Sequence, residues 1–353
     1  MNLLTLGWNK QFEEAFLPYK NSEYSVGRVA LEHKRMYRIF TEQGELLGEV
    51  SGKFRYNTLA REDFPAVGDW VVITTQQNED RALIHAVLPR QSKFSRKSAG
   101  EVTEEQIVAT NVNSIFLVAA LNQDFNLRRL ERYILLTWES GANPVIVLSK
   151  SDLCTDIEEK LARVEAIAFG VPIHVISAKE DTGIESLQQY LTDGQTVALL
   201  GSSGAGKSTL SNKLYGKDVQ AVQQVREGDD RGRHTTTHRE LIVLTTGGII
   251  IDTPGMRELQ LWDSEDSVAQ SFQDIEALSE HCRFTNCKHQ SEPGCAVLSA
   301  IDQGVLEQSR FLSFVKIKKE LAYLERKADN KARIAERKKW KKISGDRTRF
   351  HRK

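Results

Sequence analysis

A glycine-rich stretch near the middle of the chain has the residue types and spacing needed to hold a triphosphate. Gly201–Thr209 fits the pattern G-x-x-x-x-G-K-[ST] and lies between the apolar run 195–200 and a helical segment that begins at Leu210. Backbone N–H groups of such a loop surround phosphate oxygens. We predict that Lys207 contacts the β- and γ-phosphates and that Ser208 binds Mg²⁺. A turn that binds nothing is the alternative, but a Lys-Ser-Thr sequence at this spacing argues against it. The predicted contacts are Gly201, Ser202, Ser203, Gly204, Ala205, Gly206, Lys207, Ser208 and Thr209.

Two other strand ends carry groups that could select guanine. A Ser-Lys-Ser-Asp tetrapeptide follows the apolar run 144–148, and a Ser-Ala-Lys tripeptide follows the run 172–176. The carboxylate of Asp152 can accept hydrogen bonds from guanine N1–H and its exocyclic amine, which adenine cannot offer. The tetrapeptide resembles the N-K-x-D motif of GTPases with Ser149 in place of Asn, and the tripeptide resembles its S-A-K companion. A polar turn capped by Asp152 is the alternative, which the second motif disfavours. The predicted base contacts are Ser149, Lys150, Ser151, Asp152, Ser177, Ala178 and Lys179.

A second phosphate motif follows the predicted strand 248–251. In the sequence Asp-Thr-Pro-Gly, Asp252 can reach Mg²⁺ through water and the N–H of Gly255 can contact a γ-phosphate. The polar segment Gly232–Arg239 lies between this motif and the phosphate loop. We expect it to supply a threonine that binds Mg²⁺ and the γ-phosphate, and Thr236 and Thr237 are both candidates.

The residue that orients the attacking water is not obvious from the motifs. Many GTPases place a Gln directly after D-x-x-G, but here Met256 follows, and a thioether cannot orient water. We predict His234 for this role because it lies in the segment expected to close over the γ-phosphate. His238, Arg233 and a residue of a partner are alternatives.

The order of these motifs is unusual, because the guanine motifs precede the phosphate loop. In ordinary GTPases the phosphate loop comes first. A sheet can still bring the motifs together, since function depends on position in space. The sequence therefore predicts a circularly permuted GTPase.

Three cysteines and a histidine near the C-terminus have the composition of a structural metal site. Cys282, Cys287, His289 and Cys295 form the pattern C-x4-C-x-H-x5-C, which suits tetrahedral Zn²⁺. Reduced free cysteines are one alternative, and His281 is a competing ligand.

The remaining pattern predicts three domains around these sites. Five short strands within residues 24–92 fit an OB-fold β-barrel. Alternating apolar runs and helical segments predict a central α/β P-loop GTPase, and the residues beyond about 266 predict a mostly helical zinc-binding domain. The expected boundaries are 1–23 for an N-terminal extension, 24–95 for the barrel, 96–265 for the GTPase and 266–353 for the zinc domain with its basic tail. We expect residues 93–97 to be a polar connector.

The charge distribution suggests a polyanionic partner. The 353 residues have zero net charge, but residues 316–353 contain 16 Lys or Arg and 5 Asp or Glu, a local +11. No apolar run approaches about 20 residues and no secretory signal is evident. We expect a cytoplasmic protein without a membrane partner.

Together the OB-like N-terminus, the permuted GTPase core, the segment Gly232–Thr237 and the pattern C-x4-C-x-H-x5-C resemble the RsgA (YjeQ) group of circularly permuted GTPases, over nearly the whole chain. The resemblance implies a GTPase stimulated by the small (30S) ribosomal subunit and active in its late assembly. It also implies that the barrel and the zinc domain contact 16S rRNA, with GTP and GDP as ligands. We expect a monomer. The alternative is a GTP-controlled rRNA-binding module in which hydrolysis is incidental, and a weaker one is an ATP-dependent enzyme that holds single-stranded nucleic acid.

Overall fold

The computed structural model describes residues 2–20, 23–33, 35–58, 60–75, 80–97, 105–216, 239–252, 271–319, 321–322 and 326. The chain divides into two compact units, Met1–Gln260 and Leu261–Lys353.

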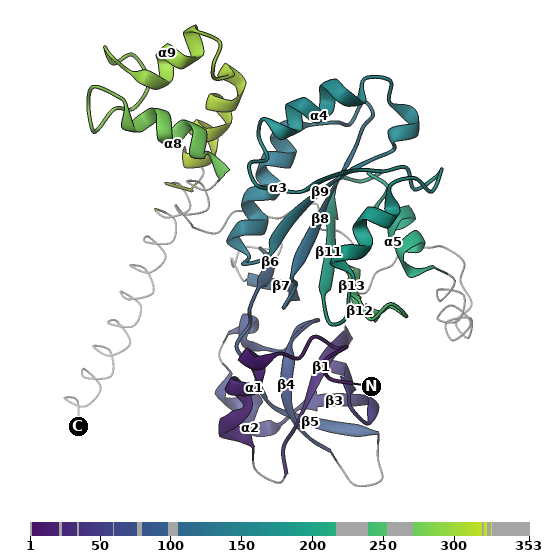
Figure 1. Ribbon diagram of the computed structural model, residues 1–353. Helices are drawn as coiled ribbons and strands as arrows, with labels where there is room; N and C mark the ends of the chain where they lie inside the picture. Colours follow the sequence, from purple (N-terminus) through teal and green to yellow (C-terminus); the bar gives the residue numbers. More distant parts are fainter. Residues whose placement is uncertain are drawn as a thin grey trace, which may run out of the picture. The chain divides into compact units, whose positions relative to one another are not determined.

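Five strands near the N-terminus close into a barrel (Figure 1). They are β1 (Ser25–His33), β2 (Met36–Thr41), β3 (Gly44–Val50), β4 (Trp70–Thr75) and β5 (Arg81–Val87). β1 pairs with both β2 and β4, and β3 pairs with β5 in parallel, so the sheet closes on itself. Val29, Ile39, Val71 and Ile84 fill the interior. The predicted OB-like barrel is therefore confirmed.

Short helices complete the barrel. α1 (Lys10–Phe16) begins where the Asn9 side chain accepts hydrogen bonds from two backbone N–H groups, and Phe12 then packs against Trp70. α1 continues into η1 (Leu17–Tyr19). The connection between β3 and β4 contains α2 (Gly52–Asn57) and η2 (Arg61–Asp63).

The central sheet has five parallel strands in the order β10-β9-β8-β11-β13, followed by the antiparallel strand β12. The strands are β8 (Ser114–Ala120), β9 (Asn143–Ser149), β10 (Ile173–Val175), β11 (Thr196–Gly201), β12 (Glu240–Val243) and β13 (Ile249–Asp252). The helical elements are α3 (Leu127–Glu139), η3 (Ser151–Leu153), α4 (Ile157–Glu165), η4 (Ile184–Tyr190) and α5 (Lys207–Tyr215). The apolar runs of β8 and β11 are buried almost throughout, as expected of strands covered on both faces.

The prediction of a polar connector at residues 93–97 was wrong. This segment is β6 (Lys93–Lys97), which forms a hairpin with β7 (Glu105–Thr110). Phe94 and Ser95 are both buried whereas Lys93 is exposed, and the pairing with β7 shifts register between Phe94 and Ser95. The segment therefore lacks the strict alternation of apolar and polar residues that indicates a strand in a sequence, and its basic residues suggested a connector.

The barrel and the central sheet are joined by backbone pairing. β1 pairs antiparallel with β12 at Leu31 and Glu240, and Glu240 also pairs with Asp252 of β13. The Arg38 guanidinium lies 2.9 Å from the Glu240 carboxylate, which adds an ion pair to this junction. One continuous sheet therefore runs from the barrel to β13, the strand that leads to the second phosphate motif.

A buried arginine connects four separate segments within the same unit. The Arg28 guanidinium donates to Leu6 O at 2.6 Å, Thr196 Oγ1 at 2.9 Å, Gly68 O at 3.2 Å and Asn111 O at 3.0 Å. Burial lowers the pKa of Arg28 to about 9, although nearby Asp69 raises it, so the group stays charged at neutral pH. Because Thr196 opens β11, this network reaches the strand that leads to the phosphate loop.

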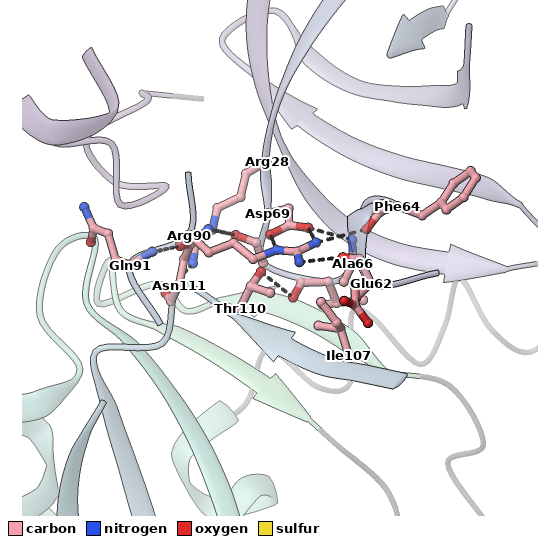
Figure 2. Close-up of polar contacts among 12 residues, drawn as sticks. Arg28, Glu62, Phe64, Ala66, Asp69, Arg90, Gln91, Ile107, Thr110 and Asn111 are labelled. Carbon is pink, nitrogen blue, oxygen red and sulfur yellow. Dashed lines mark hydrogen bonds and ion pairs between the residues drawn. The ribbon is translucent and has the colours of Figure 1, made fainter. Parts of the chain in front are cut away.

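A second buried network lies beside it. Asp69, which is fully buried, accepts from Arg90 Nε at 2.8 Å and Nη2 at 2.7 Å and from the Ala66 N–H at 2.8 Å (Figure 2). Arg90 also donates to the carbonyls of Glu62 and Phe64, so it orders the connection around η2.

The second unit contains α8 (Gln273–Glu280), α9 (Ala296–Asp302) and a further helical segment at residues 308–319. Phe272, Ile275, Val297 and Phe314 are buried in it. Arg310 donates to both carboxylate oxygens of Asp274 at 2.6 and 2.7 Å, which ties the last segment to α8.

Replacing Arg28 with Met should destabilise the first unit by about 3 kcal/mol, because buried acceptors would be left without a charged donor. Urea unfolding of the full chain measures this effect. Arg38→Met is the matched control on the next strand, where a half-exposed ion pair should contribute about 1 kcal/mol or less. Equal destabilisation in the two variants would contradict this role for Arg28.

Candidate nucleotide-binding site and metal centre

The predicted phosphate loop connects β11 directly to α5, as the motif requires. Gly204 and Gly206 have φ values of 78° and 91°, which favour glycine, and a Cβ on Gly201 would collide with the carbonyl of Val118. The Lys207 ammonium donates to the carbonyls of Gly201 at 2.7 Å and Ser202 at 2.6 Å, so it lies over the loop. The loop thus has the backbone conformation that can present N–H groups to phosphates.

The two guanine motifs come together at neighbouring strand ends. The Ser177 hydroxyl donates to Asp152 Oδ1 at 2.7 Å and accepts from the Glu180 N–H at 3.1 Å. This contact orients the Asp152 carboxylate from the following strand and leaves its second oxygen available to a base. Lys150 adopts a left-handed conformation with φ of 60°, which turns the chain sharply after β9.

Ser149 links the guanine motif to the phosphate loop. Its hydroxyl donates to the Ala205 carbonyl at 2.6 Å, and the side chain is almost fully buried. The residue that departs from the usual Asn therefore still makes a direct contact between the two halves of the site. The structure brings together all the predicted residues of the phosphate loop and of both guanine motifs.

The sequence interpretation missed Asp124, which lies in the turn after β8. Asp124 Oδ2 accepts a 2.6 Å hydrogen bond from Ser202, and this bond, more than the contacts with Arg129, lowers the pKa of Asp124. The carboxylate therefore fixes a loop residue at the entrance to the phosphate site. The available signal was its position at the carboxyl end of an apolar run.

The residues predicted to govern hydrolysis lie largely outside the described part of the chain. His234, Thr236, Thr237 and Gly255 are not among the described residues. The backbone of Asp252 ends β13, whose residue Ile251 pairs with Ala198 of β11.

The start of β12 is anchored on the first unit's hairpin. Arg239 donates to the Ile107 carbonyl of β7 at 2.9 Å, and the next residue, Glu240, pairs with Leu31 of the barrel. The segment that contains His234 and both candidate threonines therefore ends at a fixed point between hairpin and barrel.

The four predicted metal ligands form one cluster. Their ligand atoms all lie within 4.8 Å of one another. His289 Nδ1 lies 3.3 Å from Cys295 Sγ and 3.6 Å from Cys282 Sγ. Three thiols and an imidazole nitrogen facing one another are the donor set of a closed tetrahedral zinc site, so the cluster is consistent with a metal. His281, the competing ligand, is not part of it.

The surroundings of His289 fit this role. Its Nε2 lies 3.2 Å from Ser279 Oγ, and that hydroxyl donates to the Ile275 carbonyl at 2.8 Å. Ser279 is thus left to accept from Nε2–H, which leaves Nδ1 as the unprotonated nitrogen facing the sulfurs. Burial lowers the pKa of His289, which favours the neutral ring that binds metal.

Glu292 shapes the loop that carries His289. Its carboxylate accepts from the N–H groups of Lys288, Gln290 and Ser291 at 2.8 to 3.0 Å. These bonds lower its pKa to about 2. The acidic side chain therefore remains ionised and holds the loop over the pH range in which thiolates bind metal.

Comparisons with known proteins identify the architecture. The RsgA GTPase family model matches residues 87–262, and an ABC transporter model matches residues 184–345, which include the phosphate loop. The crystal structure of YjeQ from Thermotoga maritima superposes with a TM-score of 0.63 at 28% identity, covering 85% of this chain and 99% of that one. The structure of YloQ, described as a circularly permuted GTPase, gives a TM-score of 0.61 at 25% identity, covering 86% and 97%.

Two curated relatives match almost end to end. The small ribosomal subunit biogenesis GTPase RsgA 1 of Oceanobacillus iheyensis is 47% identical over 95% of this chain and 97% of its own. The corresponding protein of Opitutus terrae is 46% identical over 99% and 98%. The fold and the order of the motifs define a circularly permuted P-loop GTPase. The chain belongs to the RsgA family of these GTPases. Among the described helices, none is both long and apolar enough to cross a membrane.

Replacing Ser279 with Ala should weaken zinc binding about tenfold, because His289 would lose the partner that fixes its tautomer. Competition with a chromophoric chelator measures the affinity. Ser309→Ala, which removes an exposed hydroxyl bonded only to nearby Glu307 among the described contacts, is the control. Unchanged affinity in Ser279→Ala would show that the hydroxyl does not support the ligand.

Proposed function

We propose that this chain is a GTPase that binds the small (30S) ribosomal subunit and hydrolyses GTP late in its assembly. The observation that carries the proposal is the 2.7 Å contact between Ser177 and Asp152, which builds a guanine-reading carboxylate beside a phosphate loop. Membership of the RsgA family and the names of the near full-length relatives support the role in small-subunit biogenesis.

Each residue of the site has a distinct task in this proposal. Asp152 accepts from the guanine base, Lys150 lies along it, and the tripeptide Ser177–Lys179 supports its O6 edge. Residues of the loop Gly201–Thr209 bind the phosphates, with Lys207 exchanging its loop carbonyls for phosphate oxygens.

The divalent ion and the attacking water need further ligands. Ser208, Asp252 and one of Thr236 and Thr237 would hold Mg²⁺, which when bound neutralises charge on the phosphates. We infer that His234 orients the attacking water, since Met256 has no group for that task.

The C-terminal unit completes the proposal as an RNA-binding module. Cys282, Cys287, His289 and Cys295 would hold one structural Zn²⁺, which would stabilise a loop-rich region. The local charge of +11 in residues 316–353 suits 16S rRNA. We further propose that the protein acts in the cytoplasm as a monomer.

A second candidate function is a GTP-controlled rRNA-binding module in which hydrolysis is incidental. Met256 favours it, because the usual water-orienting Gln is missing from that position.

GTP turnover with purified ribosomal components separates the two functions. Small subunits should raise turnover at saturating GTP at least about tenfold, or about 1.4 kcal/mol in the barrier, whereas large subunits and naked RNA should not. His234→Ala should lose the stimulated rate but keep its affinity for a fluorescent GDP analogue. If GTP turnover is slow and equal under all conditions, the first function is contradicted and the GTP-controlled rRNA-binding module with incidental hydrolysis remains.

Replacing Asp152 with Asn should change base preference. The amide offers a donor where guanine needs an acceptor, so GTP affinity should fall at least about 100-fold. Xanthosine triphosphate, which has an oxygen in place of the guanine amine, should bind the variant better than GTP does. Asp156→Asn is the control, because that carboxylate is partly exposed and pairs with Lys160. Equal GTP affinity in wild type and Asp152→Asn would remove Asp152 from base recognition.

A further inference from the structure

A cavity of about 680 Å³ lies where the barrel meets the β6–β7 hairpin. Its wall includes Arg35 from the turn after β1, Arg55 from α2, Arg61 from η2 and Arg239 from the start of β12. None of these residues belongs to the nucleotide site described above. A cavity of this size falls within the range of small-ligand sites.

The charge of the cavity favours an anion. The four arginines face a single carboxylate on the cavity wall, that of Glu32. Among the residues that the structure describes, Arg35, Arg55 and Arg61 are exposed and form no ion pair. Guanidinium groups bind phosphate with two parallel hydrogen bonds, so a cluster of them suits a phosphodiester.

The rest of the wall adds features that an inorganic ion would not need. Tyr37, Phe64 and Ile107 provide apolar surface, and Figure 2 labels Phe64, Ala66 and Ile107 of this wall. Glu32 and Gln106 provide polar groups that can bond to a ribose hydroxyl or a base edge. Apolar and aromatic surface beside a basic rim is the usual pattern of sites for unpaired nucleotides.

We propose that this cavity binds one unpaired nucleotide, with its phosphate on Arg35, Arg55 and Arg61 and its base against the apolar wall. The inference deepens the proposed function, on which it rests for the RNA partner, by giving a specific site to the contact between barrel and RNA. A nucleotide within an RNA strand and a free nucleotide share this chemistry.

The cavity lies next to the start of β12, where the segment with the predicted hydrolytic residues ends. Arg239 lines it and is held by the Ile107 carbonyl, and the next residue pairs with both Leu31 and Asp252. A nucleotide in the cavity therefore contacts the end of the segment that carries the predicted hydrolytic residues.

A neighbouring cavity provides the control. It has a volume of about 660 Å³ and is lined by Lys53, Asp63, His85 and Arg90 among others. Arg90 is already paired with Asp69, and Asp63 offsets Lys53, so this cavity lacks a comparable cluster of arginines. Lys53 and Arg55 are on the same short helix but line different cavities.

The test is photocrosslinking of a hexaribonucleotide of 4-thiouridine to the full-length, GDP-saturated protein, with crosslinked peptides mapped by mass spectrometry. We expect crosslinks within residues 35–66, the part of the chain that forms most of the wall. The Arg55→Glu, Arg61→Glu double variant should reduce this yield at least about tenfold while crosslinks to the basic tail persist. In anisotropy titrations the double variant should also lower the salt slope of binding by about 0.7 for each RNA phosphate that it no longer neutralises.

Lys53→Glu makes the same charge change as the Arg55→Glu half of the double variant, on the same helix, and should leave the crosslinks at residues 35–66 in place. Equal urea midpoints establish that the variants are folded. Absence of these crosslinks, their persistence in the double variant, or an equal reduction in Lys53→Glu would each overturn the proposal.

Competition with AMP identifies the source of the nucleotide. Disappearance of the crosslink in micromolar AMP would indicate a free nucleotide, and disappearance only with unlabelled oligoribonucleotide would indicate an RNA strand; both support the cavity. If small subunits stimulate turnover but no crosslink forms here, this inference fails and the proposed function stands. If a crosslink maps to this cavity but small subunits do not stimulate GTP turnover, the nucleotide site stands and the proposed function fails.

Discussion

The buried guanidinium of Arg28 is the interaction on which the first unit depends. A charge removed from water must be compensated by hydrogen bonds, and Arg28 finds four acceptors on four different segments. Each acceptor is thereby held at one position: the N-terminal segment, the loop before β4, the segment before β8 and the first residue of β11. Arg28 therefore contacts both the loop before β4 of the barrel and the first residue of β11, the strand that leads to the phosphate loop.

Circular permutation explains why the barrel contacts both halves of the GTPase sheet. Because the guanine motifs come first, the N-terminal barrel precedes the base-reading half of the sheet, and the phosphate-reading half returns to the barrel through β12. Leu31, Glu240 and Asp252 then occupy consecutive positions across three strands. The barrel, for which we propose an RNA contact, and the sheet, for which we propose GTP binding, are joined by backbone pairing, so coupling between them would need no separate hinge or linker.

Much of this architecture was predictable because the motifs require a local context that the sequence states directly. The phosphate loop needs a strand before it and a helix after it, and the spacing of Cys282–Cys295 limits how the loop can fold. The rest depends on partners distant in sequence. Basic side chains concealed β6, Asp124 carries no motif, and nothing near Arg28 indicates that its acceptors come from residues 6, 68, 111 and 196. Such contacts arise only when the chain has folded.

Native-state hydrogen exchange of the full chain with and without GDP tests the central claim that barrel and GTPase sheet unfold as one unit. At a GDP concentration 100 times its Kd, stabilisation is about 2.7 kcal/mol, so the slowest amides should exchange about 100-fold more slowly. We expect this slowing in β1 and β4 of the barrel as well as in β11 and β13. Slowing confined to the strands of the central sheet, with unchanged exchange in the barrel, would contradict it.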